Sequence, residues 1–185
     1  TRYVESLSES QKNKIALYIN VDMVGSPNFK LSVFDGDGSK FGQAGPKGSE
    51  NIEAAFHKAF SDLGTASVET ELNGRSDYAA FSAAGIAVGG IFTGAEGVKT
   101  KEEAELFGGF EGAPYDECYH KACDSIDNIN KAAIEASVNS LASVLSGFAM
   151  SVEDIRANNK TLAYPRADKV VFPEHLYCHE DLYHQ

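Results

Sequence analysis

The residue types best suited to chemistry gather between Cys118 and Asn128, where a histidine stands between two cysteines and two aspartates follow. His120 could ligate a metal ion through its imidazole, and a nearby aspartate could hold the other ring nitrogen in the required tautomer. Tyr119 adds a phenol hydroxyl at the same place. A surface loop with a small disulfide and a solvated histidine would have the same sequence, so this stretch alone leaves both interpretations open.

A second candidate ligand, Asp22, follows the short apolar run Ile15–Val21. The run is rich in β-branched and aromatic residues and predicts a strand buried on both faces. Asp22 would then lie at the carboxyl end of a central strand, where open α/β sheets bind their ligands. Alternatively, its carboxylate caps the turn that follows by bonding to the backbone.

Strands and helices alternate along the rest of the chain, which predicts an α/β sandwich. We expect Ser49 to cap a helix that ends at Gly64, with His57 solvated outside the apolar face of that helix. The predicted strands are 31–35, 67–72 and 86–93, and the other predicted helices are 76–84, 100–106 and 128–150. In the last helix the apolar face would consist of Ile134, Val138, Leu141, Leu145 and Phe148.

The segment that begins at Asp35 resembles the start of a calcium-binding loop. The resemblance fails because the sixth position is Lys40 instead of glycine and the twelfth is Pro46 instead of glutamate. We therefore expect a polar turn at this place.

Composition places the chain among folded, acidic proteins. Hydrophobic residues make up 43% of its 185 residues, which excludes a disordered chain and suffices for one domain with a sizeable core. The net charge of −11 disfavours binding to nucleic acid or to an anionic membrane surface. No apolar run approaches the roughly 20 residues of a membrane-spanning helix. We therefore expect neither nucleic acid nor membrane among the partners.

The start of the chain and its cysteines bear on processing and compartment. The sequence begins at Thr1 without an initiating methionine or a signal-peptide core, so we expect a product of processing or truncation. Cys118 and Cys123 could close a small loop if their Cα atoms lie about 4.4–6.8 Å apart, which would leave Cys178 outside it. The triplet that begins at Asn159 fits a glycosylation acceptor. Together these features favour an oxidising, secretory route.

Four stretches of the chain, taken together, resemble a known family. In order and approximate spacing they match the co-catalytic di-zinc aminopeptidases, secreted and vacuolar enzymes that remove N-terminal residues from peptides. The resemblance covers roughly Ala16 to Met150. It implies an α/β fold with a mixed, mostly parallel sheet flanked by helices on both faces, a three-layer sandwich. The matching stretches are Asn20–Asn28, Asn73–Tyr78, Gly85–Glu96 and Tyr115–Asp124.

The resemblance also implies roles for individual residues. Asp22 and His120 would each ligate one of two zinc ions, and the phenol of Tyr119 would stabilise the tetrahedral intermediate. Two zinc ions about 3.5–4 Å apart can activate water and polarise the scissile carbonyl. In some relatives the flanking cysteines pair, which here would join Cys118 to Cys123. The residues that would contact the substrate are Arg75 and, around its first side chain, Met23, Gly74 and Phe92.

The implied substrate is a peptide with a free N-terminus, and the implied location is secreted, vacuolar or otherwise extracellular. One departure from the family concerns the other ligands. In relatives, a histidine, a bridging aspartate and a glutamate pair precede the strand that ends in the first ligand. This sequence has no histidine before His57 and no acidic pair before Asp22.

We therefore expect residues 1–150 to form the C-terminal part of a zinc peptidase domain whose sheet is incomplete at its N-terminal side. Residues 151–185 would be an extension or an edge segment. The missing N-terminal segment of the same peptidase would be the partner of this chain, and the chain alone would be inactive. The alternative is a non-catalytic α/β module that binds or inhibits.

Overall fold

A computed structural model describes residues 2–153 and residue 155. Within them a mixed four-stranded sheet has the order β1-β4-β2-β3. Strands β1 and β4 are parallel, as are β2 and β3, whereas β2 runs antiparallel to β4. The strands are β1 (Leu17–Asp22), β2 (Ser32–Phe34), β3 (Val68–Thr70) and β4 (Ala87–Phe92). The predicted α/β fold with a mixed, mostly parallel sheet is confirmed.

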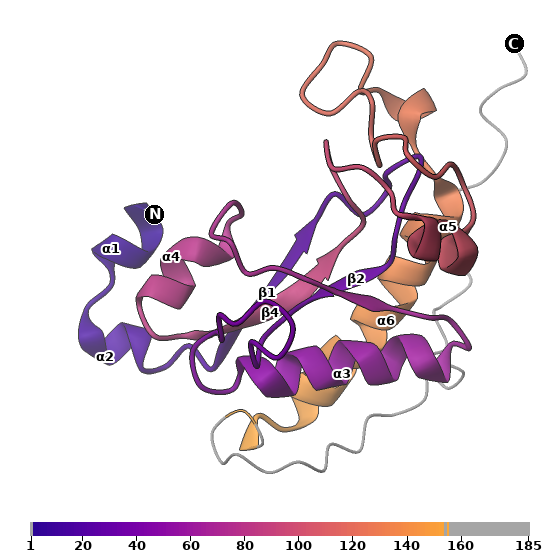
Figure 1. Ribbon diagram of the computed structural model, residues 1–185. Helices are drawn as coiled ribbons and strands as arrows, with labels where there is room; N and C mark the ends of the chain where they lie inside the picture. Colours follow the sequence, from indigo (N-terminus) through magenta and orange to yellow (C-terminus); the bar gives the residue numbers. More distant parts are fainter. Residues whose placement is uncertain (1, 154, 156–185) are drawn as a thin grey trace, which may run out of the picture.

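Helices cover both faces of this sheet, as predicted (Figure 1). Helix α3 (Ser49–Asp62) packs on the sheet and against α6 (Lys131–Met150), while α4 (Tyr78–Ala83) packs on the opposite face. The shorter helices are α1 (Arg2–Ser6), α2 (Glu9–Lys12), α5 (Lys101–Phe107) and the 3-10 turn η1 (Ile126–Asn128). Three layers therefore enclose two apolar clusters.

The two clusters follow from the alternation of side chains along the strands. On one face Val33 and Ile91 pack against the fully buried Phe56 of α3. On the other face Phe34 and Val88 pack against Tyr78 of α4. Neighbouring residues of one strand thus belong to different clusters, because successive side chains point to opposite faces of the sheet.

Strand β1 differs from its prediction. It lies at an edge of the described sheet, Asn20 is its one buried residue, and Val21 is 44% exposed. Apolarity alone predicted a central strand, but burial depends on which neighbours flank a strand. The backbones of β1 and β4 approach closely at the paired glycines of β4, because a Cβ on Gly90 would lie 1.8 Å from the carbonyl oxygen of Asn20.

Helix α3 begins at Ser49 as predicted, but the predicted serine cap is wrong. The N-cap is Gly48, whose φ of 99° suits a residue without a Cβ, and no side chain caps the helix there. The hydroxyl of Ser49 instead accepts a hydrogen bond from the backbone N–H of Val88. The Asp35 segment is a polar turn, as expected, since its carboxylate accepts backbone N–H groups from residues 39 to 41.

The buried face of helix α6 agrees only in part with the predicted one, because Phe148 is buried and Leu141 packs against the core, but other predicted residues do not. Its buried residues are mainly small, whereas Val138 and Leu145 are 48% and 47% exposed. By length and composition α6 could cross a membrane, which corrects the expectation that no run approaches that length. It also packs on α3 and contributes Val144 and Phe148 to the core.

The predicted extension 151–185 lies almost wholly outside the described residues. The same is true of the acceptor triplet at Asn159, of Cys178, and of the histidines His175, His179 and His184.

Candidate active site

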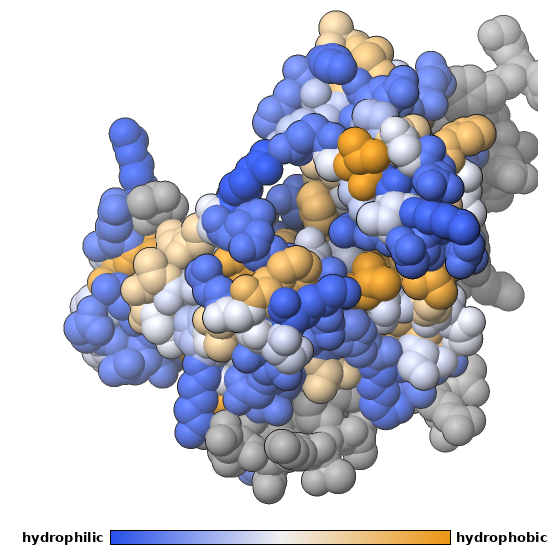
Figure 2. Space-filling model, viewed as in Figure 1, coloured by the Kyte–Doolittle hydropathy of each residue, from blue (hydrophilic) through white to orange (hydrophobic). Residues whose placement is uncertain are grey.

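A pocket of about 270 Å³ lies beside the carboxyl ends of the parallel strands β1 and β4. Asp22 ends β1 and is paired in register with Phe92, which ends β4, and both line the pocket. Figure 2 shows a hollow on this face between the sheet and the overlying loops, with mostly hydrophilic residues around it. The other lining residues are Met23, Lys30, Phe34, Thr70, Glu71, Asn73, Arg75, Ser76, Tyr78, Ala95, Glu96, Gly97, Tyr115 and Tyr119.

Two polar side chains orient the carboxylate of Asp22. The hydroxyl of Ser76 donates to Oδ2 of Asp22 at 2.6 Å and accepts from the amide of Asn20 at 2.8 Å. Asn20 is 3% exposed and stands two residues before Asp22, so both side chains leave β1 on the same face. The predicted helix 76–84 would have included Ser76, yet α4 begins at Tyr78 and its N-cap is Asp77. The spacing of Asn20 and Asp22 was the one local signal of this network.

The segment around the cysteines stands above the ends of β1 and β4 (Figure 1). The predicted disulfide between Cys118 and Cys123 is present, with 5.3 Å between the Cα atoms. The buried Asp116 holds the base of this loop, because its carboxylate accepts the backbone N–H of Cys118 at 2.8 Å and the side-chain amide of Asn128 at 2.9 Å. A covalent link and two hydrogen bonds thus fix the loop that carries His120.

Tyr119 lines the pocket, whereas His120 is exposed and is not among the lining residues. The two rings stack with 3.9 Å between their centroids, and His120 has a φ of 56°. The hydrogen bond from Arg75 lowers the pKa of Glu96, and the nearby His120 lowers it further by a smaller amount. His120 thus directly follows a lining residue in the chain but lies outside the lining set.

The predicted substrate-contacting residues gather at the same pocket. Met23, Arg75 and Phe92 line it, and Gly74 lies between two lining residues. Arg75 donates to Glu96 at 2.6 Å in a pair whose side chains are 64% and 51% exposed. Sequence reasoning had assigned no role to Glu96. Its carboxylate holds the guanidinium over the rim, although an exposed pair of this kind contributes little to stability.

The donor types of this site fit zinc. Carboxylate oxygen and imidazole nitrogen are common zinc ligands. Within residues 2–153 and 155, however, neither Asp22 nor His120 belongs to any group of three ligating side chains close enough to hold one ion.

The fold and the pocket define the class of protein, an α/β protein whose candidate site lies at the carboxyl ends of parallel strands. The chain belongs to peptidase family M28, whose family model matches residues 1–145.

Relatives with known names support this assignment. The chain is 50% identical over 153 residues to an "Aminopeptidase" of Pseudomonas aeruginosa, covering 83% of the chain and 28% of the relative. It is 46% identical over 161 residues to "Leucine aminopeptidase 2" of Arthroderma otae, covering 87% of the chain and 32% of the relative. The chain therefore spans less than a third of the length of these relatives.

Among solved structures, the fold resembles a zinc aminopeptidase from Bacillus subtilis. The TM-score is 0.53 at 24% identity, over 76% of this chain and 30% of that chain. This likeness supports the fold.

Proposed function

We propose that this chain forms part of a zinc aminopeptidase that removes N-terminal residues from peptides. The observation that carries the proposal is the pocket itself, which gathers Asp22, Arg75 and Tyr119 from three distant segments at the ends of two parallel strands. Membership of peptidase family M28 and relatives named aminopeptidase support it.

In this proposal Asp22 and His120 each ligate one of two zinc ions. Zinc, when bound, polarises a carbonyl group and lowers the pKa of water. Ser76 keeps the carboxylate of Asp22 in one orientation, and the disulfide loop presents His120. The phenol of Tyr119 donates a hydrogen bond to the oxyanion of the tetrahedral intermediate.

The substrate in this proposal is a peptide with a free N-terminus. Arg75 contacts it at the rim, while Met23, Gly74 and Phe92 form the surroundings of its first side chain. Met23 and Phe92 supply apolar surface next to the carboxylate of Asp22, because Asp22, Met23 and Phe92 line the same pocket. The disulfide supports a secreted or vacuolar location, where oxidising conditions preserve such bonds.

The remaining ligands and the general base belong, in this proposal, to an N-terminal segment of the same peptidase. A catalytic zinc usually has three protein ligands, and Asp22 and His120 supply one each. We therefore expect the 185-residue chain alone to be inactive even with zinc added. Loss of a positioned base alone typically lowers a rate by about 10²–10⁴.

The test compares the chain alone with the complete peptidase on aminoacyl-anilide substrates in the presence of zinc. We expect turnover by the complete protein, loss of turnover in D22N and H120N, and retention in the matched control D37N, which changes an exposed aspartate of the turn at Asp35. Turnover by the chain alone would contradict the assignment of the ligands. A complete protein without activity would favour a non-catalytic binding or inhibitory module.

A further inference from the structure

His57 of α3 was expected to be solvated, yet its side chain is only 30% exposed. Its Nδ1 lies 2.8 Å from the hydroxyl of Ser67, and its Nε2 is buried without a hydrogen-bond partner. If Nδ1 donates to Ser67, the lone pair is on Nε2. A hydrogen bond from the other ring nitrogen is what fixes the tautomer and the ring orientation of a histidine that ligates a metal.

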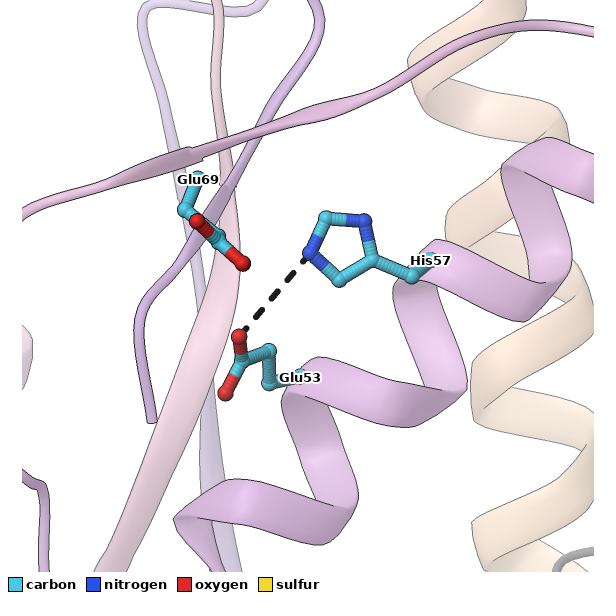
Figure 3. Close-up of side chains that lie close together, drawn as sticks. All are labelled: Glu53, His57 and Glu69. Atoms are coloured by element: carbon cyan, nitrogen blue, oxygen red, sulfur yellow. Dashed lines mark ion pairs between the residues drawn. The ribbon is translucent and has the colours of Figure 1, made fainter. Parts of the chain in front are cut away.

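Two carboxylates lie around that nitrogen (Figure 3). Oε1 of Glu53 is 3.9 Å from Nε2 of His57, too far for a hydrogen bond. Glu69 approaches from β3, and one ligating atom from each of the three residues lies within 4.8 Å of the others. The three side chains point toward one another across the space between helix and strand.

The arrangement follows from the two backbone periodicities. Glu53 and His57 are four residues apart on α3 and share one face of the helix. In β3 neighbouring side chains point to opposite faces of the sheet, so Glu69 faces α3 whereas Thr70 lines the candidate active site. Strand β3 therefore separates this cluster from the pocket.

The cluster lacks a positive charge at its centre. Burial lowers the pKa of His57, so its imidazole is neutral near pH 7 and can donate a lone pair. Burial raises the pKa of Glu53 to about 7. The ammonium group of Lys40 lies 3.8 Å from the carboxylate of Glu69 but its side chain is 52% exposed, so it offsets the negative charge of the cluster only weakly.

A neighbouring acidic group, Asp35 with Asp37, already has its partners. Asp35 accepts three backbone N–H groups and Asp37 accepts that of Ser39. Glu53 accepts the N–H groups of Gly36 and Asp37, but both bonds go to Oε2, while Oε1 faces His57. The geometry thus directs Oε1 of Glu53 to the space beside Nε2.

We propose that Glu53, His57 and Glu69 bind one zinc ion that joins helix α3 to strand β3, at a site distinct from the candidate active site. One imidazole nitrogen and two carboxylate oxygens leave one tetrahedral position for water. The mixed donor set favours zinc over calcium, which takes oxygen ligands. The ion would stabilise the folded chain by binding it in preference to the unfolded one.

Zinc binding by the complete protein is measured by equilibrium dialysis after chelator treatment, with excess calcium and magnesium present. We expect H57N and E69Q to weaken binding of one zinc ion by a factor of ten or more. The side-chain amide of asparagine can replace Nδ1 as donor to Ser67 but supplies nothing at the place of Nε2. In E50Q, the matched control on α3, the new side chain keeps the oxygen that accepts from Gly48, and zinc binding should be unchanged.

The variant H120N separates the two sites, because it should leave the zinc bound near His57 in place. Nitrogen-15 imidazole spectra of the unmodified protein give a second readout that needs no variant to fold. On adding zinc, Nε2 of His57 should shift as a metal-bound nitrogen while Nδ1 stays protonated. Zinc binding unchanged in both H57N and E69Q, or an unshifted Nε2 at saturating zinc, would overturn the proposal.

Discussion

Replacing Ser76 by alanine tests how the candidate active site is assembled. The change removes the hydroxyl that donates to Asp22 at 2.6 Å and accepts from Asn20 at 2.8 Å. A hydrogen bond to a charged group contributes about 1.5–3 kcal/mol. At about 1.4 kcal/mol for each factor of ten, this predicts roughly 10–100-fold weaker zinc binding at Asp22. That range matches the usual effect of removing a group that orients a metal ligand.

The measurement is the zinc concentration that gives half-maximal aminopeptidase activity, determined on the complete peptidase after metal removal. Asn20, which is 3% exposed, also loses its acceptor, and S76A should therefore lower the free energy of unfolding by about 1–3 kcal/mol. Assays well below the melting temperature separate this effect from metal binding. The variant S61A, which changes an exposed serine of α3, serves as the control.

The reasoning would be refuted by a half-maximal zinc concentration that S76A changes by less than twofold. Such a result would mean that Asp22 does not bind the metal, or that Ser76 does not orient it. A fall in the maximal rate at saturating zinc, with zinc affinity unchanged, would also contradict the role assigned here.

Three further predictions concern the framework. Reducing the disulfide between Cys118 and Cys123 should lower the activity of the complete peptidase at least tenfold without unfolding the sheet, since the loop that fixes His120 is released. Activity that survives full reduction, verified by thiol titration, would contradict this prediction. The variant G90A should destabilise the fold by more than about 3 kcal/mol, because its Cβ would meet the Asn20 carbonyl oxygen 1.8 Å away; denaturant unfolding measures this. The pKa of Glu53 is raised to about 7 in the folded state, so between about pH 4.5 and 7 the folded chain binds more protons than the unfolded one. The free energy of unfolding of the metal-free protein should therefore fall by roughly 1–3 kcal/mol as the pH rises through this window. E53Q should flatten that dependence, and an unaltered slope would show that another group causes it.

Much of the fold could be predicted because its signals are local. The strand before Asp22, the buried strand with its paired glycines, and the helices that begin at Ser49 and near Lys131 all follow from apolar spacing and turn residues. Asp22 was singled out because it ends a predicted strand, and His120 because it stands between two cysteines. Their assignment as zinc ligands came from the family resemblance and stays a prediction. The disulfide between Cys118 and Cys123, which spacing alone left open and the family resemblance implied, is present.

The errors arose where burial depends on neighbours distant in sequence. The spacing of large apolar residues in α6 predicted a face that includes Val138, yet Ala133, Ser137 and Ser140 are buried where the helix lies against its neighbours. Small residues allow close packing without adding a hydrophobic signal, so the pattern of large side chains predicted the buried face only in part.

The sequence by itself determined which segments form strands and helices and which residue types stand at their ends, because backbone periodicity and turn preferences act within a few residues. Only the tertiary structure decided the partners of those residues. Ser76 reaches Asp22 across 54 positions, and Glu69 meets Glu53 and His57 from a different element. Such contacts depend on how strands order themselves in the sheet and which helix covers which face. These are properties of the packed chain, and no local pattern encodes them.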